Sequence, residues 1–180
     1  MAGFVADERK LAELIVWAGQ LMADDPAAGA TKLNKVLFYS DFIHHRRYGR
    51  PITGAEYQKL QHGPAPRRLL PVRDELAARG DIRMRPEPVF LHTIERVVPQ
   101  RDPNLDLFTP TEQEVVKEVV RLLDRMTAAD ASHLSHDEFG WQWVEMGETI
   151  PYFTAFAEPE VEVTEHMRQR AAELAESLGQ

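Results

Sequence analysis

One stretch, residues 31–48, constrains the fold of this chain more than any other, because it is apolar on more than one side of a helix. Its apolar residues recur at the three-, four- and seven-residue spacings of a helical face, and a second apolar flank lies beside that face. A helix covered on two sides must be central, so the other elements are expected to pack around it. The first face holds Leu33, Val36, Leu37, Ser40 and Ile43, and the second holds Phe38, Tyr39 and Phe42.

The boundaries of this central helix and of its neighbours can be predicted from capping signals. Thr31 can cap its start, and Gly49 supplies its stop. Further helices are expected over residues 7–22 and 67–79. The strongest helix start is Thr109-Pro110 with Glu112 at the third position, and Thr53 followed by Glu56 has the same capping-box spacing. The Thr53 signal predicts a short helix that carries Tyr57 and Leu60.

The single convincing β signal lies in residues 81–98. Residues 81–85 alternate polar and apolar, Pro86-Glu87-Pro88 is expected to form the turn, and residues 89–98 are rich in β-branched side chains. We therefore predict a mainly α fold of the α+β type, a single compact helical domain with one small β-hairpin. The domain is expected to cover residues 1–160 with the hairpin near 81–98, and residues 161–180 to form a charged, peripheral C-terminal helix.

Composition excludes several classes of protein. The 180 residues include no cysteine, which excludes disulfides, thiol catalysis and thiolate metal sites and favours a reducing cytoplasm. No apolar run approaches the roughly 20 residues that a membrane span needs, so no membrane association is expected. Net charge divides unevenly: residues 1–85 carry 14 basic and 10 acidic side chains, and residues 86–180 carry 7 and 19, which together give -8. Such a division favours oriented binding of charged partners, although two solvated faces would look the same.

The histidines and acids do not form a recognisable reaction centre. His133 and His136 stand three residues apart beside Asp137 and Glu138, but the HExxH arrangement of zinc enzymes is missing. The adjacent His44 and His45 would point about 100° apart on a helix. Neither a G-x-S-x-G elbow nor a P-loop occurs. We therefore expect a protein that is not an enzyme and has no metal and no cofactor.

Two readings remain open for the basic residues. A helix rich in arginine followed by a hairpin is typical of winged-helix DNA-binding regulators, and phosphate binding needs such a basic stripe. Acidic residues interleave these arginines and the sequence pI is about 5.4, so an acidic protein partner fits equally well. The arginines concerned are Arg67, Arg68, Arg73, Arg79, Arg83 and Arg85.

The segment from His62 to Pro66 is the most specific local feature. Its two prolines limit the freedom of the unfolded chain and remove two backbone donors. It is either a tight connector between helices or a preorganised loop that presents His62, Arg67 and Arg68 to a partner.

Five motifs in a fixed order resemble the Panacea domain, also called the SocA-like antitoxin domain. The similarity covers roughly residues 11–153. The chain departs from the family pattern around the Gly-Pro, where Leu60-Gln61-His62 stands in place of an aromatic residue and a lysine and Ala65-Pro66 stands in place of a valine. The motifs are Lys32-Leu33 with Lys35 to Tyr39, Tyr57-Gln58 with Gly63-Pro64, Leu107-Phe108-Thr109 with Glu112, Leu134-Ser135-His136 with Trp141, and Ile150-Pro151.

The resemblance implies a mainly helical antitoxin domain of prokaryotes and their phages. Such domains neutralise unrelated toxins by direct binding, and the founding example also works as a proteolytic adaptor that delivers its toxin to the ClpXP protease. The implied partner is thus a cognate toxin protein, with a ClpXP-type protease as a further one and nucleic acid as the alternative. On the basic side of the chain, the expected contact residues are Arg46, Arg47, His62, Arg67 and Arg68.

Overall fold

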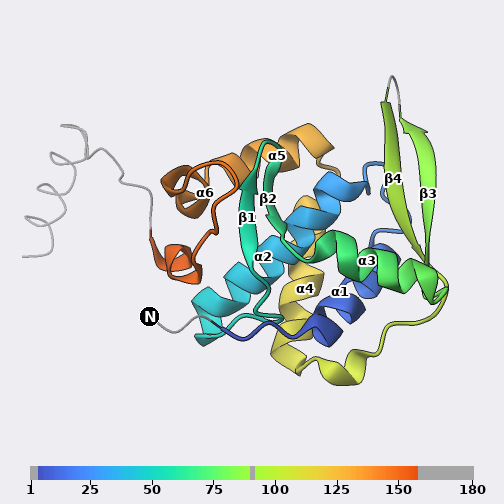
Figure 1. The fold of residues 1–180 in the computed structure, drawn as a ribbon, viewed down its shortest axis with the longest axis horizontal. Coiled ribbons are helices and arrows are strands. Elements are labelled where there is room, and N and C mark those ends of the chain that lie inside the picture. Colours follow the sequence, from blue (N-terminus) through green and yellow to red (C-terminus); the bar gives the residue numbers. More distant parts are fainter. Residues whose placement is uncertain (1–3, 90–91, 158–180) are drawn as a thin grey trace, which may run out of the picture.

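A single helix, α2 (Ala30–Tyr48), runs through the middle of the molecule, as its sequence predicts (Figure 1). The computed structural model describes residues 4–89 and 92–157. Elements from every part of this range contact α2: α1 (Glu8–Leu21), α4 (Pro110–Leu123), α5 (Ala128–His136), and the strands β2 and β4. The central position follows from the two apolar flanks, since each needs its own cover.

The remaining elements complete a mainly α fold with two small antiparallel sheets, which confirms the predicted class. Strand β1 pairs with β2 in front of α2, and β3 pairs with β4 at the side of the molecule (Figure 1). The bounds are β1 (Tyr57–Leu60), β2 (Gly63–Pro66), α3 (Leu69–Ala78), β3 (Ile82–Val89), β4 (His92–Pro99), η1 (Leu105–Leu107), α6 (Phe139–Trp143) and η2 (Tyr152–Phe156).

The strongest local signals give the predicted structure. Thr109 caps α4, Pro110 is its first residue, and Thr109 and Glu112 bond each other's backbone in a complete capping box. Strands β3 and β4 form the expected hairpin, in register from Ile82 opposite Pro99 to Val89 opposite His92. Its turn was predicted wrongly: Pro86, Glu87 and Pro88 lie within β3 and pair with β4. These elements rest on neighbouring residues, so the sequence alone suffices to predict them.

Two further local predictions are wrong. Residues 53–60 do not form a helix: the Thr53 hydroxyl donates to Asp41 and accepts from the N–H of Ala55, Gly54 turns the backbone at φ +66°, and β1 follows. The Glu56 carboxylate, the other half of the expected capping box, accepts from the hydroxyl of Thr149. Thr31 does not cap α2, which begins at Ala30 with Gly29 in the capping position.

The expected C-terminal helix over residues 161–180 lies outside the described residues, so the division of the chain at residue 160 stays a prediction. Within the described part, none of the helices is both long and apolar enough to cross a membrane.

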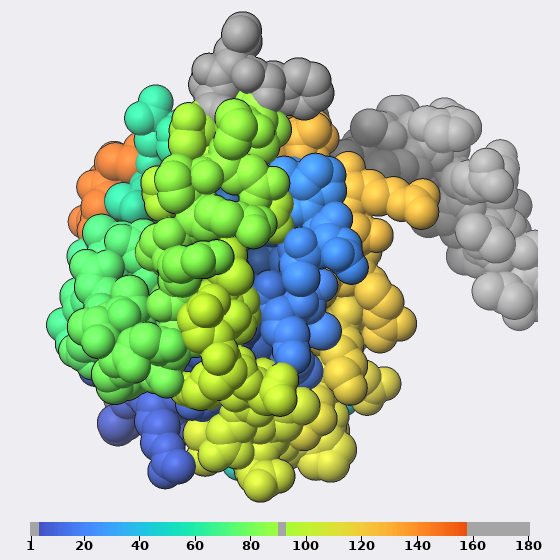
Figure 2. Space-filling view, turned by 90° about the vertical axis from the view of Figure 1, so that its right-hand side faces the viewer, coloured from blue at the N-terminus to red at the C-terminus, as the bar shows by residue number. Residues whose placement is uncertain are grey.

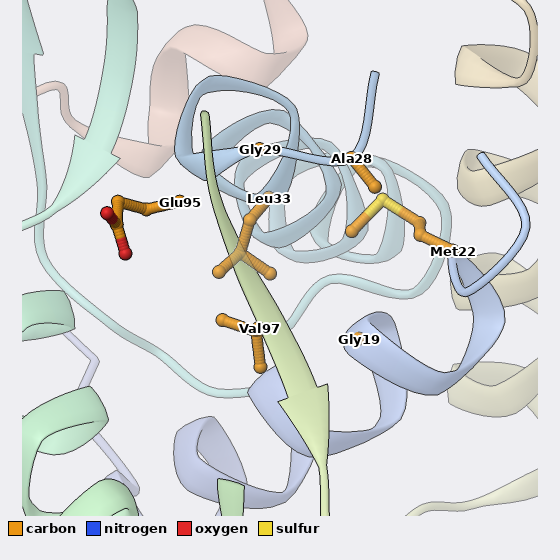
Figure 3. Close-up of a pocket in the computed structure, with 7 residues that line it drawn as sticks. All are labelled: Gly19, Met22, Ala28, Gly29, Leu33, Glu95 and Val97. Carbon is orange, nitrogen blue, oxygen red and sulfur yellow. The ribbon is translucent and has the colours of Figure 1, made fainter. Parts of the chain in front are cut away.

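The β3–β4 hairpin docks on α1 and α2 through two glycines. Figure 3 shows β4 passing over the corner between these helices, with Leu33 and Val97 facing the same small space, a cavity of about 10 Å³. A Cβ on Gly19 would stand 3.1 Å from Val97 Cγ1, and one on Gly29 would stand 3.0 Å from Ile94 Cβ. The strand therefore lies as close as it does because both positions lack a side chain. Figure 2 shows the hairpin, in green, lying directly against the blue surface of the N-terminal part of the chain.

We expect the substitution Gly19→Leu to lower the free energy of unfolding by about 2–3 kcal/mol, because overpacking a filled seam forces the strand off the helix. Urea denaturation followed by circular dichroism measures this loss. The matched control is Gln20→Leu at the exposed next position, where a change within about 0.5 kcal/mol is expected. Equal effects of the two variants would contradict the tight seam.

Helix α2 also buries polar side chains, which bind its neighbours. Lys32 pairs with Asp25 and donates to the carbonyl of Met126 at 2.8 Å. Asp41 is fully buried and accepts four hydrogen bonds: from the backbone N–H and the hydroxyl of Thr53, and from the hydroxyls of Tyr57 and Tyr152. Burial raises the pKa of Asp41, and the donors act against that rise.

Candidate functional site

The turn between β1 and β2 brings together residues from three of the sequence motifs. Gly63 has a φ of +99°, and a Cβ at this position would collide with both Lys35 Nζ and Ser135 Oγ. Lys35 donates to the carbonyl of His62 at 2.5 Å. We call Lys35, Gly63, Ser135, His136 and Trp141 the tip cluster. Its close contacts require glycine at the turn, which explains the Gly-Pro of the motif.

Lys35 is wholly buried, and among the described residues it has no carboxylate partner. Burial lowers the pKa of its ammonium group to about 8, because the charged form loses its hydration. A lysine beside a serine is one arrangement that activates a nucleophile. Here Ser135 donates its proton to the carbonyl of Ser132 at 2.7 Å, and both Lys35 and Ser135 are 0 % exposed, so a substrate would not reach them. Lys35 and Ser135 therefore hold the β1–β2 turn in place.

The stability of the protein should therefore depend on pH through Lys35. In the folded chain Lys35 loses its proton near pH 8, whereas in the unfolded chain it keeps the proton up to about pH 10.5. Between these values the folded state binds fewer protons, so the free energy of unfolding rises with pH, by about 3 kcal/mol over the window. Urea denaturation of the wild type and of Lys35→Met at pH 7 and at pH 9.5 measures the difference. If the free energy of unfolding changed with pH equally in the two proteins, the buried ammonium group of Lys35 would be contradicted.

Trp141 packs against the same turn from its outer side. Its ring stacks on His136 at 4.0 Å between centroids, and Lys59 Nζ lies 4.2 Å from the ring centroid on a cation–π contact. The indole N–H donates to the carbonyl of Leu60 at 3.2 Å. Burial and then the nearby Lys35 charge lower the pKa of His136. The aromatic motif thus holds the β1–β2 turn against α5 and α6.

The exposed His62 lies at the end of this turn and lines a surface groove of about 890 Å³ between α5, β4 and the loop before α2. His133 and His136 line the groove too. In residues 4–89 and 92–157, no three histidine, aspartate or glutamate side chains are placed to hold a metal ion. Three imidazole groups are thus among the polar side chains that line the groove.

The five predicted contact residues are all exposed, but they have different neighbours. Arg47 forms a bidentate ion pair with Glu118, with N···O distances of 2.6 and 2.7 Å. Arg67 donates to the carbonyl of Gly147, and Arg68 pairs with Glu8 at 2.7 Å. Arg46 lines a cavity beside α2, and His62 lines the groove. They remain a prediction, spread over several parts of the surface.

The basic stripe expected of a DNA-binding protein is neutralised within the fold. Of the six arginines named for that reading, five have a carboxylate within 4.0 Å. A phosphate would have to displace these acids, which works against binding. The pairs are Arg67–Glu56, Arg68–Glu8, Arg73–Asp74, Arg79–Asp81 and Arg85–Glu87.

Sequence reasoning used Lys35 as part of a motif but missed its burial. The signal was present: Lys32 and Lys35 stand three residues apart, beside Leu33 and Val36, inside a helix that is apolar on two faces. A charged residue on a covered helix needs a partner, so two such lysines indicate two carbonyl or carboxylate contacts.

Comparison with known proteins points to one family. The family model described as "Antitoxin SocA-like, Panacea domain" matches residues 33–142. The matched range begins within α2, ends in α6 and contains the whole tip cluster. No curated protein and no solved structure gives a significant match.

Proposed function

Because the chain belongs to the SocA-like Panacea antitoxin family, we propose that it is an antitoxin that neutralises a cognate toxin protein by binding it directly. The family match, which extends over more than half of the chain, is the observation that carries the proposal. A bound protein that covers the functional surface of a toxin keeps the toxin from its target, so binding alone is sufficient.

The tip cluster supports a binding role. Lys35, Ser135 and Trp141 hold the turn at His62 in one conformation before any partner arrives. A surface fixed in advance loses less conformational entropy on binding, which favours affinity. We place the toxin contacts on the basic residues, which suit an acidic surface on the toxin. They are Arg46, Arg47, His62, Arg67 and Arg68. Three of them, Arg47, Arg67 and Arg68, would exchange their carboxylate partners within the chain for acidic groups of the toxin.

The test is to purify the tagged chain from its native host and to identify any protein that accompanies it in fixed proportion. That protein is then expressed alone and together with the chain. We expect growth arrest in the first case and growth in the second. A partner that is harmless alone, or one whose toxicity the chain leaves unchanged, would overturn the proposal.

The contact residues can be tested with a purified toxin. We expect Arg68→Glu to weaken toxin binding about tenfold or more, which corresponds to about 1.4 kcal/mol. The stability should change little, because the Arg68–Glu8 pair is exposed and such pairs contribute about 0–1 kcal/mol. Calorimetric titration measures the affinity, and Arg121→Glu on the exposed side of α4 is the matched control. If Arg68→Glu bound as tightly as the control, this placement would be wrong.

Degradation is a second way in which binding would neutralise the toxin, as in the adaptor mode of the family. The half-life of the toxin, measured in cells with and without the chain, distinguishes degradation from covering of the toxin surface alone. A half-life that the chain shortens only where ClpXP is present would support delivery to the protease, and an unchanged half-life with restored growth would support covering alone.

A further inference from the structure

A second groove, of about 790 Å³, is formed by the start of the described chain, the end of α2 and η2. These segments lie side by side at the left of the molecule in Figure 1, with η2 in red. We call it the aromatic groove, because rings form most of its walls. Phe153 is 41 % exposed and Phe156 is 55 % exposed, and rings that stand open together are typical of a contact surface. The lining rings are Phe4, His45, Tyr152, Phe153 and Phe156.

Three of the four polar side chains that line the aromatic groove already have partners. Glu56 accepts a hydrogen bond from the hydroxyl of Thr149 at 2.8 Å and lies 3.7 Å from the guanidinium of Arg67. The Tyr152 hydroxyl donates to a backbone carbonyl at 2.7 Å. The fourth is His45, whose Nδ1 is closed to solvent and so cannot bond an occupant. What stands open is mainly apolar surface, so the occupant needs an apolar face rather than a particular hydrogen-bonding group.

The chain itself continues from the edge of the aromatic groove. The described part ends at Ala157, next to Phe156, and residues 158–180 follow. Met167 stands ten positions after Ala157, and ten residues reach at most about 35 Å. Attachment at the rim raises the effective concentration of a segment at the groove, to about the millimolar range for short linkers. A segment of this chain therefore has an advantage over a separate molecule.

The sequence of residues 158–180 provides an apolar face. Four apolar residues recur at the four-, three- and four-residue spacings of one side of a helix, and we call them the apolar stripe. Thr164 can cap the start of such a helix, and Gly179 can end it. Its opposite side would carry glutamates, which stay in water. The apolar stripe consists of Met167, Ala171, Leu174 and Leu178.

Charge favours the same contact. Residues 158–180 carry six acidic and two basic side chains, a net charge of -4. The last turn of α2, which contributes His45 to the aromatic groove, also carries Arg46 and Arg47, and Arg50 follows it. Arg50 is exposed and forms no ion pair within residues 4–89 and 92–157. An acidic segment is therefore attracted to the end of the molecule where the groove lies.

We propose that residues 158–180 fold back as a helix over the aromatic groove, with the apolar stripe against Phe4, Phe153 and Phe156. The contact lies within one chain and covers the open rings of the free protein. It goes beyond the proposed function, because it needs no toxin and holds whether or not the chain neutralises one.

The absence of cysteine from the sequence allows a single label to test the contact in the full chain. Gln169→Cys, on the side of the expected helix away from the apolar stripe, is coupled to a nitroxide, and NMR spectra are compared before and after the nitroxide is reduced. We expect broadening at Ala6 and Ile150, which line the aromatic groove, and none at Val97 in β4, on the other side of the molecule (Figure 1). Ala6 and Ile150 resonances that stay sharp would overturn the proposal.

A mixing experiment distinguishes the chain's own segment from that of a second copy. Isotope-labelled chain without nitroxide is mixed with nitroxide-labelled chain that carries no isotope, so only contacts between copies cause broadening. We expect no broadening at Ala6 or Ile150 in the mixture. Broadening there as strong as in the singly labelled chain would assign the aromatic groove to a second copy and overturn the contact within one chain.

Two matched variants test the apolar stripe in the nitroxide-labelled chain. Leu174→Glu places a charge in the stripe and should abolish the broadening at Ala6 and Ile150. Ala172→Glu adds the same charge outside the stripe and should keep it. Both substitutions lie outside the described residues, so the core packing described above does not involve either position. Equal broadening in the two variants would show that the stripe does not make the contact, and the proposal would be wrong.

Discussion

Replacing Gly63 by alanine should lower the free energy of unfolding by about 3 kcal/mol or more, the first of two large effects that the structure predicts. Two penalties add. A residue with a Cβ at a φ of +99° is strained by about 1–2 kcal/mol. The new methyl group also collides with Lys35 and Ser135, whose side chains are fully buried and cannot swing away, and such overpacking is unfavourable by about 1–3 kcal/mol.

The matched control is Gly49→Ala at the end of α2. Gly49 also has a positive φ, of +76°, but nothing lies within 4 Å of the position of its Cβ. This variant should therefore lose only about 1 kcal/mol, from backbone strain alone. Urea denaturation monitored by circular dichroism measures both variants. A Gly63→Ala protein that is as stable as Gly49→Ala would mean that the tip cluster is loose enough to accept a methyl group.

The second large effect is expected at Asp41. Asp41→Ala should lower the free energy of unfolding by about 3–5 kcal/mol, because it leaves the donors of Thr53 and Tyr57 buried without an acceptor. Asp41→Asn should lose less. Three donors meet Oδ2 and only the Thr53 N–H meets Oδ1, so an amide oriented with its oxygen at Oδ2 opposes a single donor.

Tyr152→Phe completes this series as its mildest member. It removes a 3.3 Å bond to Asp41 and a 2.7 Å bond to the carbonyl of Ala55, so a loss of about 1–2 kcal/mol is expected. Chemical denaturation should rank the three variants Asp41→Ala, Asp41→Asn, Tyr152→Phe from least to most stable. A loss below about 1 kcal/mol in Asp41→Ala would show that water replaces the carboxylate, contrary to its full burial.

Features that rest on neighbouring residues could be predicted from the sequence. The cap of α4 needs only Thr109, Pro110 and Glu112. The β3–β4 hairpin follows from its alternation, but Pro86 and Pro88 pair within β3 and do not form its turn. The capping-box spacing at Thr53 looked equivalent, and the prediction failed there because Gly54 turns the backbone at φ +66° and the Glu56 carboxylate accepts from Thr149, 93 positions later. Local rules cannot detect a competitor that only the folded chain brings near.

The candidate site is harder to predict than the fold for the same reason. The family motifs named Lys35, Gly63 and Trp141, but not that they meet at one turn. The cavity beside α2 has no sequence signature, since its wall combines apolar residues of α2, α4 and α5 that any core would contain.

The buried polar contacts of α2 also have a consequence for the order in which the chain folds. Lys32 bonds a carbonyl 94 positions later, and Asp41 bonds a hydroxyl 111 positions later. Contacts between such distant positions form slowly, because long loops must close first. On the ribosome, α2 emerges long before Met126 and Tyr152 exist. Until then Lys32 has only Asp25 as a partner within the chain, and Asp41 only Thr53 and Tyr57. The central helix is thus among the first segments synthesised and among the last to become native.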